Sequence, residues 1–92
     1  MNLLKQLSAL SADYPTMTVK NLVLLLSISE KGPMTSNQIA KANKMELSQC
    51  RKIITRFTNE IPILSFKNQQ KGGRLRFISP EVQAKFPEIF FI

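Results

Sequence analysis

Histidine is absent from the 92 residues of this chain, and cysteine occurs once, as Cys50. A single cysteine excludes an internal disulfide and is typical of a reducing compartment. The chain also has only six acidic residues, which are scattered. It therefore lacks the general base, the close carboxylate pair and the tetrahedral ligand set on which most catalytic and zinc sites depend. We expect no enzymatic activity, no metal and no cofactor.

Long apolar runs are missing as well. The longest, residues 22–26, is far shorter than the roughly 18 residues that a membrane-spanning helix requires. Near the N-terminus Lys5, Gln6 and Ser8 interrupt what would be the apolar core of a signal peptide. We therefore expect a cytoplasmic protein with no membrane partner, and the length predicts a single domain over residues 1–92.

Acidic residues are few compared with basic ones. Thirteen lysines and arginines against six acids give a formal net charge of +7. Residues 41–76 hold nine basic and two acidic residues, whereas the remainder of the chain is neutral. A positive charge confined to one segment favours a polyanionic partner, and this segment should contain the binding surface.

Two helix signals precede the basic segment. Leucines at helical spacing predict a helix over residues 3–12. Thr16 or Thr18 can cap a second helix that runs to about Lys31. This second helix is apolar on several sides, which predicts that it is buried on several sides.

A tight helix–turn–helix pattern follows. Thr35 and Gln38 stand three residues apart, as in a capping box at the start of a short helix. Asn43 suits a left-handed position after that helix, because asparagine tolerates a positive φ. Ser48 is the expected N-cap of a further helix, about residues 48–60.

A β-hairpin is predicted next. Residues 63–66 and 74–77 have the composition and alternation of strands, and residues 68–73 have the composition of a turn. Arg74 and Arg76 stand two apart, so both should point to the same face. A last helix should begin at the sequence Ser-Pro-Glu of residues 79–81.

Two short helices joined by a tight turn and followed by a basic hairpin are the pattern of a winged helix-turn-helix, a mainly α fold with a small β-hairpin wing (α+β). Its second helix, here about 48–60, lies in the major groove of DNA, and its wing, here about 63–78, contacts the minor groove or the backbone. The candidate DNA-binding residues are Thr35, Ser36, Ser48, Gln49, Arg51, Lys52, Thr55, Arg56, Asn59, Lys67, Lys71, Arg74 and Arg76.

These side-chain types suit different parts of DNA. Arginine and lysine can neutralise phosphates or bond guanine. Gln49 and Asn59 can pair with adenine, and Thr55 can contact a thymine methyl group. Ser48, with the amides of the helix N-terminus, can hold a phosphate. Tyr14 and the six phenylalanines are expected in the core or in an interface.

The stretch LVLLLSISEKGPMTSNQIAKANKMELSQCRKIITRF, together with GGRLRFISPE, resembles the winged-helix core of MarR-type transcriptional regulators. The resemblance extends over residues 19–86. It implies a small, dimeric, sequence-specific regulator that binds double-stranded DNA. The chain departs from the family in carrying Gly72 where an Asp usually stands two positions before the wing arginine, here Arg74.

Members of that family are longer, with terminal helices that dimerise and build an effector pocket. This comparison favours a reduced regulator without a small-molecule effector, encoded by a bacterium, phage or plasmid and associated with the nucleoid. A DNA-binding adaptor for plasmid or phage partition or replication is an alternative, and so is a winged-helix protein-interaction module. RNA binding is less favoured, because no stacking platform is evident.

Two further expectations concern apolar residues and the thiol. A twofold dimer could use the residues Leu3, Leu4, Leu7, Leu10, Phe90 and Phe91. The alternative is that the C-terminal tail covers the core of its own chain. Cys50 should pack as a small apolar residue, although Arg51 and Lys52 could instead lower its pKa and make it redox-sensitive.

Overall fold

The computed structural model describes residues 3–68 and 73–90. Lys71, Gly72 and Phe91, which the sequence analysis singled out, lie outside the described residues. Within the described part, the chain forms five α-helices, one π-helical turn (η1) and a two-stranded hairpin. In order these are α1 (Leu3–Asp13), α2 (Val19–Lys31), α3 (Ser36–Ala42), α4 (Leu47–Thr55), η1 (Arg56–Glu60), β1 (Leu64–Asn68), β2 (Arg74–Ile78) and α5 (Pro80–Lys85).

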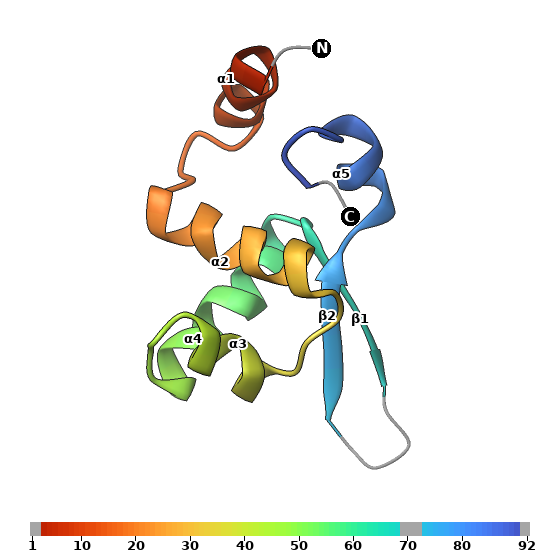
Figure 1. Ribbon diagram of the computed structural model, residues 1–92. Helices are drawn as coiled ribbons and strands as arrows, with labels where there is room; N and C mark the ends of the chain where they lie inside the picture. Colours follow the sequence, from red (N-terminus) through yellow and green to blue (C-terminus); the bar gives the residue numbers. More distant parts are fainter. Residues whose placement is uncertain (1–2, 69–72, 91–92) are drawn as a thin grey trace.

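The elements are arranged around α2, which lies near the middle of the molecule (Figure 1). Helices α3 and α4 lie on one side of α2 and contact each other, and β2 contacts both α2 and α3. Helices α1 and α5 lie at the opposite end of the molecule from α3 and α4 (Figure 1). The predicted helix pair, hairpin and final helix are therefore present, and the fold is a winged helix-turn-helix.

The hairpin is antiparallel and pairs Leu64 with Ile78 at its base and Asn68 with Arg74 near its tip. A third segment joins it through an isolated bridge between Met34 and Arg76. The Met34 amide donates to the Arg76 carbonyl at 3.0 Å, and the Arg76 amide donates to the Met34 carbonyl at 2.7 Å. The wing is thus fastened to the segment that leads into α3.

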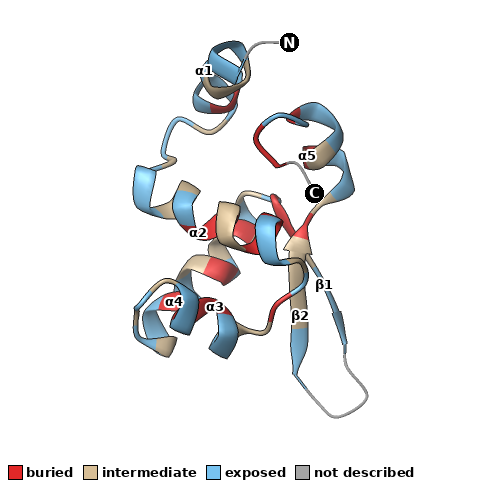
Figure 2. Ribbon diagram, viewed as in Figure 1, coloured by how far each residue is buried: buried red, intermediate tan, exposed pale blue. Residues whose placement is uncertain are grey.

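The core is built around α2, as its broad apolar surface predicts. Leu24, Leu25 and Ile28 are fully buried there, and each such side chain contributes about 1.5–3 kcal/mol to folding. The buried residues lie where α2 faces α3, α4, the base of the hairpin and α5 (Figure 2). The core residues from these other elements include Ile39, Ala40, Cys50, Ile54, Phe57, Ile63, Leu64, Ile78, Val82 and Phe86.

The predicted helix starts are confirmed at two sites. Thr18, and not Thr16, caps α2, because its Oγ1 accepts a hydrogen bond from the Asn21 amide at 3.1 Å. The capping box of α3 is present in both directions. The Gln38 amide donates to Thr35 Oγ1 at 3.3 Å, and the Thr35 amide donates to Gln38 Oε1 at 2.9 Å.

The turn between α3 and α4 differs from the prediction. Asn43 has a φ of −104°, and the left-handed residue is Lys44, with a φ of 53°. The reason is that the Asn43 side chain is bound: its Nδ2 donates to the Ile39 carbonyl at 2.9 Å and to Ser27 Oγ at 3.1 Å. These bonds hold Asn43 against α2 and α3, so the chain reverses one residue later.

The N-cap of α4 was also predicted two residues too late, at Ser48. The helix begins at Leu47 with Glu46 as its N-cap, and Ser48 is its second residue. No side chain caps this end. The Cys50 amide bonds the Glu46 carbonyl at 3.0 Å, and Leu47 packs against the core, so packing rather than a capping hydroxyl sets the boundary.

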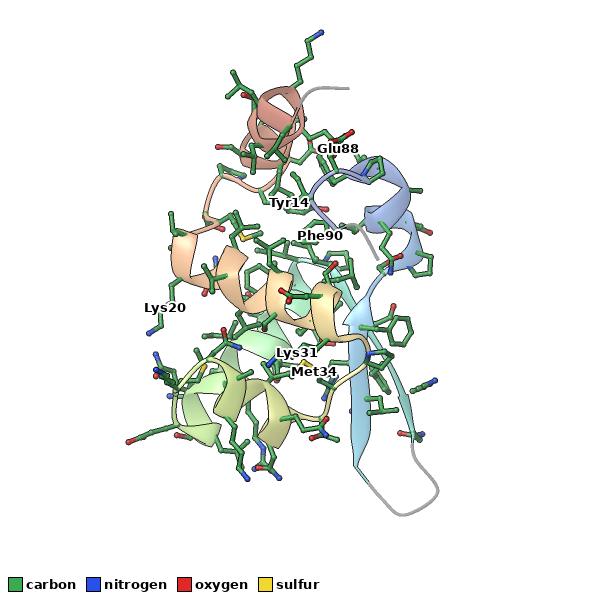
Figure 3. The ribbon with its side chains drawn as sticks, viewed as in Figure 1. Tyr14, Lys20, Lys31, Met34, Glu88 and Phe90 are labelled. Atoms are coloured by element: carbon green, nitrogen blue, oxygen red, sulfur yellow. The ribbon has the colours of Figure 1, made fainter. Side chains whose placement is uncertain are left out.

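The C-terminal tail folds back over the core of its own chain, as the alternative to a dimer contact predicted. Ile89 and Phe90 are buried, and so is Leu10 of α1. Tyr14, Glu88 and Phe90 lie between α1 and α5 (Figure 3), and the Glu88 amide donates to Gln6 Oε1 at 2.8 Å. Leu10 and Phe90, predicted for dimerisation, therefore fill the core of the single chain.

Candidate nucleic-acid interface

Helix α4 has one buried side and one exposed polar side. Cys50 and Ile54 are buried, and the Cys50 thiol contacts the Ser36 carbonyl at 3.7 Å. This contact fastens α4 to the first turn of α3. The opposite side exposes five of the residues predicted for DNA binding, which are Ser48, Gln49, Arg51, Lys52 and Thr55.

The helix changes type at Arg56, which the sequence did not indicate. Residues 56–60 form a π-helical turn, in which the Ile61 amide bonds the Arg56 carbonyl at 2.9 Å. A π turn contains more residues than an α turn, so side chains beyond Thr55 no longer follow the spacing that placed them beside Gln49 and Lys52. Asn59 is exposed on this turn.

Arg56 is directed toward its own chain. Its Nη2 donates a hydrogen bond to Thr16 Oγ1 at 2.9 Å, in the loop between α1 and α2. Its guanidinium group also lies 5.9 Å from the centroid of the Phe57 ring, which is buried. Arg56 thus has an internal role that the prediction of a DNA contact did not include.

The two wing arginines share one aromatic partner. The guanidinium carbon of Arg74 lies 4.6 Å from the centroid of the Phe66 ring, and that of Arg76 lies 5.1 Å from it. Phe66 pairs with Arg76 across the hairpin and remains 41% exposed. The prediction that Arg74 and Arg76 share a face is confirmed. Phe66 is not in the core, and its exposed ring serves as a platform for both arginines.

These elements enclose a hollow of about 280 Å³ that brings α3, α4 and the wing together. Arg51 reaches it from α4, and Arg74 and Arg76 reach it from β2. The remaining residues that line it are Thr35, Ser36, Asn37 and Gly73. Asn37 was not among the predicted site residues, although it directly follows the predicted pair Thr35 and Ser36.

Arg76 is the least solvated of the three arginines. Its Nε atom is buried and has no hydrogen-bond partner among residues 3–68 and 73–90. Burial, and then the charge of Arg74, lower the pKa of Arg76 below its ordinary value. The side chain nevertheless remains cationic at neutral pH, because an arginine is protonated there in any protein environment.

Lys67 lies apart from this cluster. It lines a different hollow of about 220 Å³, which is mainly apolar and lies between the end of α2, the hairpin and α5. Neighbouring residues of a strand point to opposite faces, so Lys67 and Phe66 cannot share one. The structure therefore does not bring Lys67 together with Arg74 and Arg76.

The cysteine, the acidic residues and the helices give three further findings. Cys50 is buried, as expected of a small apolar residue, and burial raises its pKa and outweighs the opposing charge of Arg51, which is contrary to the alternative of a lowered pKa. In the described ranges, no three cysteine or acidic side chains gather as a metal site would require. No described helix combines the length and apolar character needed to cross a membrane.

No family model matches the chain, and no curated protein matches it in sequence. Solved structures of similar shape exist. The MarR family transcription regulator SP03579 aligns at a TM-score of 0.67 and 16% identity, over 79% of this chain and 49% of that protein. YusO from Bacillus subtilis aligns at 0.70 and 17%, over 91% and 59%. Bordetella bronchiseptica BpsR, whose DNA binding is regulated by 6-hydroxynicotinic acid, aligns at 0.67 and 17%, over 92% and 63%.

These likenesses establish the fold. The chain has the winged helix-turn-helix fold of MarR-type regulators, as its sequence pattern predicts. It spans only 49% of the first of these structures and 59% of the second.

Proposed function

We propose that the chain is a sequence-specific double-stranded DNA-binding protein that acts as a small, dimeric transcriptional regulator. Helix α4 would lie in the major groove, and the wing would contact the minor groove or the backbone. The observation that carries the proposal is the convergence of Arg51 from α4 with Arg74 and Arg76 from the wing on one hollow. Two elements that are distant in sequence thereby form one cationic surface.

The remaining surface of α4 supports the same function. Gln49, Lys52 and Thr55 are exposed, while the other side of the helix is anchored in the core. A helix with one exposed polar side and one buried side can present polar side chains to base edges while it stays packed against the core. Similar solved structures include transcription regulators, and for BpsR DNA binding is regulated by a small molecule.

The dimeric part of the proposal rests on apolar side chains that remain exposed. Leu3 and Leu4 of α1 are 50% and 70% exposed, and Val19 and Val23 of α2 are 80% and 54% exposed. Exposed apolar residues on two helices of a small domain support a protein interface. A twofold dimer would place two α4 helices about 34 Å apart, which matches successive major grooves on one side of DNA.

Selection from random duplex DNA, followed by affinity measurements at several salt concentrations, tests this function. If each subunit neutralises about five phosphates, log affinity should fall against log salt with a slope of about −4 to −5 per subunit. The selected site should be an inverted repeat. Tandem repeats would instead favour a partition or replication adaptor, and a slope near −1 would exclude the basic segment as the binding surface.

A further inference from the structure

We propose that the hollow between the first turn of α3, helix α4 and the wing binds one phosphate group, held by Arg51, Arg74 and Arg76, with Phe66 as the positioning residue. This inference deepens the proposed function and rests on it for the source of the phosphate, which would be the DNA backbone. A free inorganic phosphate has the same chemistry and is the other source to be tested.

The charges around the hollow favour an anion. Three arginines line it, and none of the described lining residues is acidic. Guanidinium groups that share a small volume repel one another, and Arg74 is one of the causes that lower the pKa of Arg76. A doubly charged or singly charged oxyanion between them would replace this repulsion by attraction and would accept their forked hydrogen bonds.

A buried donor also awaits an acceptor here. The Nε–H of Arg76 is removed from solvent and has no partner in the described part of the chain. Leaving a charged donor buried without an acceptor costs free energy. Arg76 also lines the hollow, so a phosphate oxygen bound there could accept hydrogen bonds from its guanidinium group, and from Nε after a small movement of the side chain.

The backbone holds both sides of the hollow in place. Arg76 is joined to Met34 by two backbone hydrogen bonds, just before the lining residues Thr35 and Ser36. On the other side, the Cys50 thiol contacts the Ser36 carbonyl, and Arg51 directly follows Cys50. The wing and α4 are therefore fastened to the same three-residue segment, so the arginines would meet a ligand with little rearrangement.

Phe66 orients the two wing arginines. Its ring lies within 4.6 Å and 5.1 Å of their guanidinium carbons, and an arginine stacked on an aromatic ring loses conformational freedom before any ligand binds. Phe66 itself carries no charge and would not bond the phosphate. It acts through Arg74 and Arg76, so its removal should weaken binding while the net charge of the protein stays unchanged.

The first experiment uses the full chain labelled with ¹⁵N and inorganic phosphate as the probe. Titration should shift the Nε–Hε signal of Arg76 in a saturable way. Arg76→Gln should abolish the saturable shifts of the Arg51 and Arg74 signals. Lys5→Gln, which removes the same charge from α1 at the other end of the molecule (Figure 1), should leave them unchanged. The proposed site would be refuted if the arginine signals did not saturate with phosphate, or if Lys5→Gln reduced their shifts as much as Arg76→Gln does.

The second experiment identifies the source of the phosphate. A selected DNA duplex should displace inorganic phosphate from the Arg76 signal, and Arg76→Gln should reduce the salt slope of DNA binding by about one per subunit. Phe66→Leu should lower affinity on every sequence, and Phe66→Tyr should restore it. A duplex that binds without displacing phosphate would contradict the DNA source but leave the phosphate site intact. A chain that binds phosphate and no duplex would refute the proposed function alone.

Discussion

Arg56 and Thr16 are joined by a 2.9 Å hydrogen bond that links the start of η1, directly after α4, to the loop between α1 and α2, forty residues earlier in the chain. Two nearby contacts belong to the same region. Asp13 and Tyr14 contact Lys85 and Phe86 of the final helix, through an ion pair and through rings 6.5 Å apart. The loop therefore contacts the C-terminal segment on one side and η1 on the other.

This hydrogen bond predicts that Arg56 contributes to stability. Arg56→Ala and Thr16→Val should each lower the free energy of unfolding by about 1 kcal/mol, because a hydrogen bond to a charged group is lost. In a double-mutant cycle the two losses should not add, with a coupling of about 0.5–1.5 kcal/mol measured by urea denaturation. A coupling of zero would mean that the bond contributes nothing. Gln49→Ala, on the exposed side of α4, is the control without a stability effect.

The turn between α3 and α4 predicts opposite effects at neighbouring residues. Lys44→Gly should stabilise the fold by about 0.5–1 kcal/mol, since glycine adopts the φ of 53° without the steric cost that lysine bears. Asn43→Gly should destabilise it by about 1 kcal/mol or more, because both side-chain hydrogen bonds are lost. Thermal unfolding of the two variants checks the pair. Stabilisation by Asn43→Gly would contradict the assigned roles.

Phe90 distinguishes a tail that covers its own core from a tail that joins two chains. Phe90 is 1% exposed, so Phe90→Ala should lower the free energy of unfolding by about 3–5 kcal/mol. Phe90→Leu should cost less and keep the chain folded for sedimentation. The expected result is reduced stability at unchanged solution mass. A lower mass with unchanged stability would instead place Phe90 in an interface between chains.

Cys50 should be protected in the folded chain. Burial raises its pKa above the ordinary value of 9.0, so the folded state retains the thiol proton at a pH where the unfolded state releases it. The stability that results is present below pH 9.0 and is lost as the pH rises through the higher folded pKa. At pH 8 a thiol reagent should react with Cys50 of the native protein no faster than local or global unfolding exposes the thiol. Cys50→Ala should remove part of the decline in stability at high pH. Rapid labelling of the native thiol would contradict this prediction.

Residues on α4 and on the wing should affect DNA binding differently. Gln49→Ala should relax the preference at one base position and cost about 1–3 kcal/mol on the selected site, if the amide pairs with adenine. Arg74→Ala should weaken binding by a similar factor on all sequences, because a phosphate contact carries no sequence information. Affinities for the selected site and for its single-base variants separate the two. Equal losses on every sequence for Gln49→Ala would remove that residue from base recognition.

The sequence alone determined the α-helices, the hairpin and where the charge lies. Helix spacing, the capping pair Thr35 and Gln38, and the alternation around Arg74 and Arg76 are local properties, because they depend on residues within a few positions of one another. The positive charge of residues 41–76 also follows directly from the sequence, since net charge depends only on which residues are present. These features predicted the winged helix-turn-helix and most of the exposed residues of α4.

Only the tertiary structure decided how those residues are used. Arg56 is directed to Thr16 because a π turn shifts the helix spacing and places a hydroxyl from another loop within reach. Phe66 became a platform for arginine because the hairpin register sets it opposite Arg76. The hollow requires that Met34 pair with the wing, and the burial of Phe90 requires the core beneath it. Each of these outcomes depends on contacts between residues far apart in the chain, which the packing of the core selects and local sequence cannot specify.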